Sequence, residues 1–207
     1  MIKALLLIFE PAAAWERISR AQRGVAFIFL TYLLPMLLLT AIVEGYGLQH
    51  WGKSREIGAR RMYSTGEVVI FEVAQTLLYM IVVAVGAKLI KSIGETFHGR
   101  HTFTQAFTSV VYGLGPFFLL HLVDGLKDVF PWVPWGIGII LTAGVLYQGL
   151  PRIMEPDPSH AFGLYFMGSL LLLLTTGLAR FVTAWYLAGK FVGLESSIST
   201  LGNRLQF

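Results

Sequence analysis

Four ionisable residues lie within stretches that are otherwise apolar: Glu72, His121, Asp124 and Arg180. A charged side chain is costly inside a bilayer, so residues of this kind usually face the interior of a helix bundle and mark ion paths, proton relays or buried pairs. Proton exchange, cation binding and pairing between helices are the chemistries these groups support. Thiolate chemistry is excluded, because the chain has no cysteine.

Glu72 is followed at helical spacing by Thr76 and Tyr79. Residues three, four and seven apart lie on one side of a helix, so the three side chains form a partly polar stripe that can face a bundle interior. The alternative is a carboxylate near the membrane surface whose stem lies along apolar neighbours while its head reaches water. The sequence leaves both interpretations open.

His121 and Asp124 are three residues apart, which places them one turn apart on a helix. They could relay protons or hold a cation, or Asp124 could meet water at the helix end. Arg180 lies eighteen residues beyond Phe162, roughly 27 Å along a helix at 1.5 Å per residue. It could reach the far membrane surface, or it could pair with Glu72 or Asp124.

The elements that must position these residues are membrane spans. Of the 207 residues, 55% are hydrophobic and 14% are charged, against about 25% charged in soluble domains. About 20 apolar residues cross a bilayer. The sequence therefore predicts an all-α integral membrane bundle of five transmembrane helices within residues 24–193. The spans are expected at about 25–43, 68–90, 107–126, 132–150 and 161–188, with a short polar tail at 194–207.

Residues 1–23 combine apolar side chains such as Leu5 and Trp15 with Arg17, Arg20 and Arg23. This pattern is typical of an amphipathic helix lying in the membrane interface, although an ordinary lead-in to the first span would also fit. The apolar run 4–9 is too short for a signal peptide, so we expect no cleavage.

Small residues predict where the helices bend and approach one another. Gly113, Gly115 and Pro116 are expected to kink the third span. Small residues four apart allow close helix packing in lipid. Four such residues near the end of the last span therefore predict a packed bundle or a homo-oligomer: Ala184, Ala188, Gly189 and Gly193.

The stretch "YQGLPRIMEPDPSHA", residues 147–161, gathers charges between the last two spans. We interpret it as a rigid hairpin rather than a reaction site. Gly149 and Pro151 are expected to stop the fourth helix, and Asp157 is expected to cap the fifth.

No metal or cofactor is expected. His98 and His101 in "HGRH" could approach one zinc ion, but no further ligand is evident nearby, so two solvated loop histidines are the simpler interpretation. The sequence has no glycine-rich phosphate loop, serine elbow or paired catalytic carboxylates, which argues against an enzyme. The basic residues are scattered, so the lipid bilayer rather than nucleic acid is the expected partner.

Lys and Arg near the span ends divide almost evenly between the two faces of the membrane. The positive-inside rule therefore favours a cytoplasmic amino terminus only through the cations that precede the first span.

Three stretches resemble the Yip (Ypt-interacting protein) domain family in its bacterial branch: "FEPAAAWERI" at 9–18, "HTFTQAFTSVVYGLGP" at 101–116 and "VLYQGLPRIMEPDPSHA" at 145–161. The number and spacing of the spans resemble that family as well. The resemblance implies a small five-span protein of a bacterial inner membrane. It transfers no catalytic residues, and the short leading segment does not support carrying over the binding of small GTPases.

Two functions remain. The first is a non-enzymatic role in membrane organisation, scaffolding or a trafficking-like process, acting through helix packing and the amphipathic lead-in. The alternative is a small transporter or channel subunit with an interior polar path, whose substrate the sequence does not name.

Overall fold

Five long helical stretches dominate the computed structural model, which describes residues 2–54, 60–96 and 101–188. Within these residues, all five are long and apolar enough to cross a bilayer. They are Val25–His50 (α3 Val25–Ile28, η1 Phe29–Leu33, α4 Leu34–His50), α5 Thr65–Thr96, the broken third stretch (α6 Phe103–Gly113, α7 Gly115–His121, η2 Leu122–Gly125), α8 Trp132–Met154 and α9 Ala161–Leu187. The predicted all-α fold with five spans is confirmed, and the chain is an integral membrane protein.

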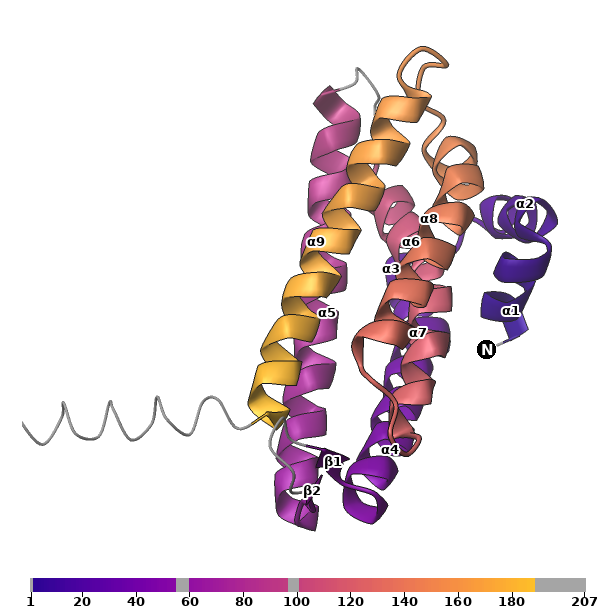
Figure 1. Cartoon of the computed structure of the whole chain (residues 1–207). Helices are drawn as coiled ribbons and strands as arrows, with labels where there is room; N and C mark the ends of the chain where they lie inside the picture. The colour runs from indigo at the N-terminus through magenta and orange to yellow at the C-terminus, as the bar shows by residue number, and fades with distance from the viewer. Residues whose placement is uncertain (1, 55–59, 97–100, 189–207) are drawn as a thin grey trace, which may run out of the picture.

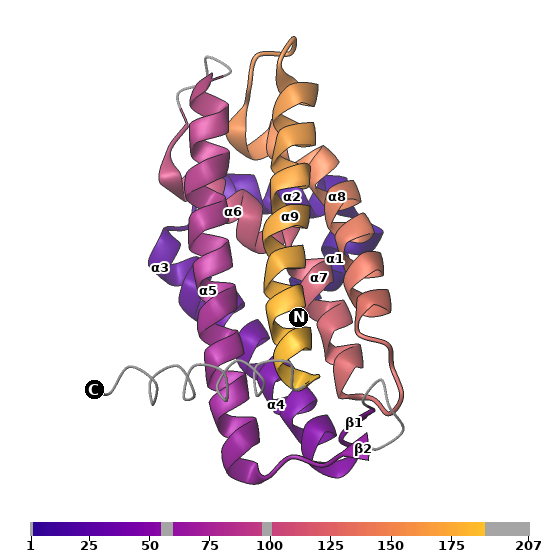
Figure 2. The same ribbon diagram turned by 60° about the vertical axis from the view of Figure 1, so that its left-hand side comes forward.

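The third stretch lies at the centre of the bundle. In its most apolar window, 78% of the residues are buried, against 22% for α9 at the periphery. It packs against α4, α5 and α8, and α9 lies across α5 and α8 (Figures 1 and 2). Residues of α6 and α7 are therefore shielded by protein, which makes this stretch the best place for polar groups away from lipid.

The amphipathic amino-terminal segment forms two helices where the sequence predicted one. They are α1 Ile2–Phe9 and α2 Pro11–Ala21, joined at Glu10, whose φ of −132° is not helical. Pro11 suits the start of α2, because a first-turn residue needs no backbone N–H. We call α1 and α2 together the N-terminal hairpin. It lies beside α7 and α8 on the outside of the bundle (Figure 1).

Two predictions about the stretch 147–161 are wrong. Helix α8 continues through Gly149 and Pro151 to Met154, and it ends where Glu155 turns into the left-handed region at φ 44°. Pro151 removes one hydrogen bond in the last turns, which the helix tolerates. Asp157 does not cap α9, because the helix begins at Ala161 after His160, and no side chain caps it.

A two-residue antiparallel pairing, β1 Lys53–Ser54 with β2 Arg60–Arg61, completes the described elements. It lies at the end of the bundle where α4 ends and α5 begins (Figure 2). Because Lys53 belongs to it, this connection brings a cation to that end of the bundle.

Candidate functional site

Five polar side chains from different elements meet inside the bundle. We call them the charge cluster: Glu44 on α4, Gln75 on α5, His121 on α7, Asp124 on η2 and Arg180 on α9. Each is at most 4% exposed. All come from the end of the bundle where α4, η2 and α9 end and α5 begins. The cluster therefore links four of the five spans at one level.

His121 is the centre of the charge cluster. Its Nδ1 lies 3.0 Å from Asp124 Oδ2, and its Nε2 lies 3.0 Å from Glu44 Oε2. A neutral imidazole carries a proton on only one nitrogen. Both contacts are hydrogen bonds at the same time only when both nitrogens carry a proton. In the neutral ring, Nε2 can instead accept from Gln75 Nε2, which lies 3.1 Å away, so the site accommodates both protonation states of His121.

Arg180 and Gln75 complete the hydrogen bonds of the two carboxylates. Arg180 Nη2 donates to Asp124 Oδ2 at 2.5 Å and to the Pro131 carbonyl at 3.0 Å. Gln75 Nε2 donates to Glu44 Oε2 at 2.6 Å. With a protonated His121, two cations face two anions, and this balance makes burial of the charges tolerable.

Not every polar atom of the charge cluster has a partner. Four buried atoms of the cluster have no hydrogen-bond partner among the described residues: Glu44 Oε1, Gln75 Oε1, Asp124 Oδ1 and Arg180 Nε. Both carboxylate oxygens of Glu72 also lack one. Glu72 packs against Gly45, the residue after Glu44, since its Cγ is 3.4 Å from where a Cβ on Gly45 would stand. The site thus keeps spare acceptors next to a protonatable ring.

Proton exchange is the chemistry that these groups support most directly. Atoms of Glu44, His121 and Asp124 lie within 4.8 Å of one another, a spacing that a divalent cation could bridge. Such an ion would have to displace a proton from His121 and compete with Arg180 for Asp124. The donor set therefore fits a proton better than a metal.

The structure brings the sequence-predicted residues to one end of the bundle. Of the two partners left open for Arg180, Asp124 is the one in contact. Tyr79 is buried, with its ring edge-on to His121 at 5.4 Å between centroids, whereas Thr76 is half-buried. Glu72 is 8% exposed, so it does not reach the surface of the bundle.

Sequence reasoning missed Glu44 and Lys53. The span predicted at 25–43 stops short of the real helix, which continues to His50 and carries Glu44 into the bundle. Lys53 Nζ donates to the backbone oxygen of Asp124 at 3.0 Å. The sequence signal that could have pointed to Glu44 is the pair of glycines, Gly45 and Gly47, that follows it. A Cβ on Gly47 would lie 2.3 Å from the Gly125 oxygen, so α4 and η2 touch there.

His101 is buried rather than solvated, with 6% of its surface exposed. Its ring fills the space beside Gly94, where a Cβ would lie 2.2 Å from His101 Cδ2. Burial lowers the pKa of His101. His98 lies outside the described residues.

A second set of contacts fixes the N-terminal hairpin to the bundle. Trp15 is fully buried, and its Nε1 donates to the Val145 carbonyl at 2.9 Å. A Cβ on Gly149 would lie 2.2 Å from the Trp15 ring, and Tyr112 meets that ring edge-on at 6.4 Å. We call these contacts between α2, α6 and α8 the hairpin seam.

The predicted kink residues lie where the central stretch breaks. α6 ends at Gly113 and α7 begins at Gly115, with Pro116 in its first turn. A Cβ on Gly113 would meet Leu146 at 2.5 Å, and one on Gly115 would meet the Tyr32 hydroxyl at 2.4 Å. These glycines thus also permit close packing against α8 and η1.

The predicted packing residues take a smaller part in the described structure. Ala184 and Ala188 are half-buried near the end of α9, and Gly189 and Gly193 lie outside the described residues. Close approaches between helices occur instead at the Gly47–Gly125 contact and at Gly149.

Comparison with known proteins gives one family. A family model described as the Yip1 domain matches residues 5–192. No curated protein and no solved structure matches the chain. The matched range includes the charge cluster, the hairpin seam and all five helices long enough to cross a bilayer. The chain belongs to the Yip1 domain family.

Proposed function

We propose that the protein is a non-enzymatic membrane-organising protein that acts through its N-terminal hairpin. The observation that carries the proposal is the division of α1 into two faces. Ala4 and Leu7 are fully buried against the bundle, whereas Ile2, Leu5 and Phe9 are 76%, 47% and 79% exposed. Large apolar side chains on an anchored helix provide a surface that can insert into lipid.

The charges around the hairpin support the same role. Arg17 and Arg20 lie on α2, beyond the apolar face of α1. Cations beside an apolar face add attraction to anionic lipid headgroups. We place the protein in a bacterial inner membrane with a cytoplasmic amino terminus, following the resemblance and the cations before the first span. Membership of the Yip1 domain family agrees with a role in membrane organisation or trafficking.

Reconstituted wild-type protein is expected to reduce the size of liposomes, and the double change Ile2→Ser with Phe9→Ser is expected to abolish the effect. The two substitutions remove apolar surface from the outward face of α1 without touching the hairpin seam. Vesicle diameters from cryo-electron microscopy at equal protein density measure the result. Phe130→Ser is the matched control, because Phe130 is 66% exposed but belongs to the connection before α8. If the wild-type protein leaves the vesicle diameter unchanged, the proposal is wrong.

Proton-coupled transport is the second candidate, and the charge cluster is the observation that favours it. Glu72 is buried with both carboxylate oxygens unpartnered, next to Glu44 and its contact with His121. Intramembrane carboxylates beside a protonatable ring are the usual components of proton relays.

Under this second candidate, proteoliposomes carry a proton flux that Glu44→Gln or Glu72→Gln lowers to the level of empty vesicles. Each change keeps the side-chain volume but removes an exchangeable carboxylate. A pH-sensitive dye trapped in the vesicles measures the flux. Glu16→Gln is the control, because that carboxylate is exposed on α2. A wild-type flux of zero, or one indifferent to both changes, counts against transport.

A further inference from the structure

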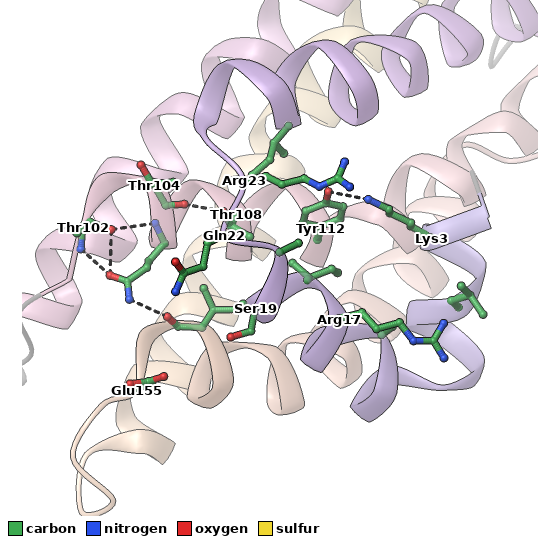
Figure 3. A pocket seen from close by; sticks show the side chains of 17 residues that line it. Lys3, Arg17, Ser19, Gln22, Arg23, Thr102, Thr104, Thr108, Tyr112 and Glu155 are labelled. Carbon is green, nitrogen blue, oxygen red and sulfur yellow. Dashed lines mark hydrogen bonds between the residues drawn. The ribbon is translucent and has the colours of Figure 1, made fainter.

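A cavity of about 570 Å³ lies between the N-terminal hairpin and the bundle, and it has both polar and apolar walls. This volume lies within the range of roughly 300–1,000 Å³ that small-molecule sites occupy. The cavity lies between α2, the first turns of α6 and the end of α8 (Figure 3). Its charged lining consists of Lys3, Arg17 and Arg23 against a single acid, Glu155. The excess of cations points to an anionic occupant.

The three cations of the cavity form no ion pair within the part of the chain that the structure describes. Arg23 stacks over the Phe27 ring at 4.3 Å, and Lys3 Nζ donates to the Tyr112 hydroxyl at 3.4 Å. No carboxylate forms an ion pair with either, or with Arg17, among the described residues. Partial burial and the positive charge of Arg23 lower the pKa of Lys3. Two like charges thus lie close together at a place that an anion would stabilise.

A neighbouring hollow extends the cationic lining. Lys3 and Arg23 also line this hollow of about 350 Å³, together with Thr31 and Tyr32. The Tyr32 hydroxyl does not open into it, because this oxygen is fully buried and lies 2.4 Å from where a Cβ on Gly115 would stand. The two cations therefore supply the polar groups that an anion in the hollow would meet.

The place of the cavity favours a lipid over a soluble anion. Arg23 precedes the first residue of the first span, and Ile28 in that span also lines the cavity. Leu6 and Ile18 add an apolar wall from the hairpin. A cavity with cations at the start of a span and apolar walls beside them matches both parts of a phospholipid, its phosphate and the start of its acyl chains.

We propose that Lys3 and Arg23 bind the phosphate of an anionic phospholipid, which then fills the space between the hairpin and the bundle. Of the outward face of α1 that carries the proposed function, Ile2 also borders the smaller hollow, whereas Leu5 and Phe9 line neither the hollow nor the cavity. Occupancy of the lipid site can be measured without any change in membrane shape, so the two proposals fail or succeed independently.

Phosphatidylglycerol titrated into the full-length protein in zwitterionic detergent, with bound lipid counted by native mass spectrometry, tests the site. The wild type is expected to bind one molecule in preference to phosphatidylcholine. The double change Lys3→Gln with Arg23→Gln is expected to weaken this binding about 25-fold, since each cation near lipid contributes about a fivefold factor. Arg20→Gln is the matched control on α2, because Arg20 does not line the cavity and pairs with Glu16. Equal weakening by Arg20→Gln would overturn the site in favour of general surface attraction.

Two further measurements keep the test decisive. Tyr32→Phe removes a hydroxyl that does not open into the hollow, so it is expected to leave lipid binding unchanged, and a several-fold loss would contradict the assignment of the phosphate to the two cations. Lys3→Arg with Arg23→Lys keeps both cations and is expected to retain it, which guards against loss through misfolding. Inorganic phosphate is added alone and as a competitor. If it binds as tightly as the lipid and displaces it, the site belongs to a free anion and the lipid assignment is wrong.

Discussion

Replacing Arg180 by glutamine is expected to lower the free energy of unfolding by roughly 3–5 kcal/mol, the range for breaking a buried ion pair from one side. The Asp124 carboxylate would lose its 2.5 Å partner and remain buried beside a second anion, Glu44, across His121. The Pro131 carbonyl would lose its donor as well. Unfolding in mixed micelles by added denaturing detergent, followed by circular dichroism, measures the change.

A double-mutant cycle identifies the partner of Arg180. Asp124→Asn added to Arg180→Gln is expected to cost far less than it costs alone, because the carboxylate has already lost its partner. Glu72→Gln is the matched control: it removes another buried carboxylate, one whose oxygens have no hydrogen-bond partner among the described residues, so its effect is expected to add to that of Arg180→Gln. Coupling with Glu72 and additivity with Asp124 would contradict the observed pair.

The spans could be predicted from the sequence because the bilayer imposes a length and a composition on every crossing segment. Hydropathy does not say where a helix ends once it leaves the apolar core. The first helix therefore continues past Val43 and brings Glu44 into the bundle, where the sequence placed it in a connection. The same limit explains Pro151, which lies inside the last turn of α8 rather than after it.

The partners within the charge cluster could be only half predicted. An ionisable residue in a span has to find a partner, and this argument identified His121, Asp124 and Arg180. Which residues meet depends on how α7, η2 and α9 pack, and no spacing along the chain carries that information. The 2.5 Å contact between Asp124 and Arg180 joins residues that are 56 positions apart.

The hairpin seam was the least visible feature in the sequence, although all three stretches that resemble the Yip domain family contribute to it. Trp15 comes from the first and Gly149 from the third, and the ring occupies the space that a Gly149 side chain would need. Tyr112 comes from the second stretch and meets the same ring. The motif residues therefore have a shared physical reason, which is the attachment of the N-terminal hairpin to α6 and α8.

Gly149→Ala is accordingly expected to release the N-terminal hairpin while the five spans stay folded. The new Cβ would stand 2.2 Å from Trp15, and the ring cannot move aside without losing its bond to the Val145 carbonyl. Losing a buried tryptophan costs roughly 3–5 kcal/mol, which corresponds to more than a hundredfold rise in the detached population. The effect is confined to the hairpin, because Trp15 packs beside the bundle rather than between its spans.

Because the chain has no cysteine, a single Leu7→Cys reports attachment of the hairpin directly. Leu7 is fully buried against the bundle, so a membrane-impermeant maleimide should label it slowly in the parent and more than a hundredfold faster with Gly149→Ala. Gly144→Ala is the control on the same helix, since nothing lies within 4 Å of a Cβ there. Equal labelling rates in the two glycine variants would show that Gly149 does not hold the hairpin. Fast labelling with unchanged helix content would show that the hairpin detaches from the bundle as a separate unit.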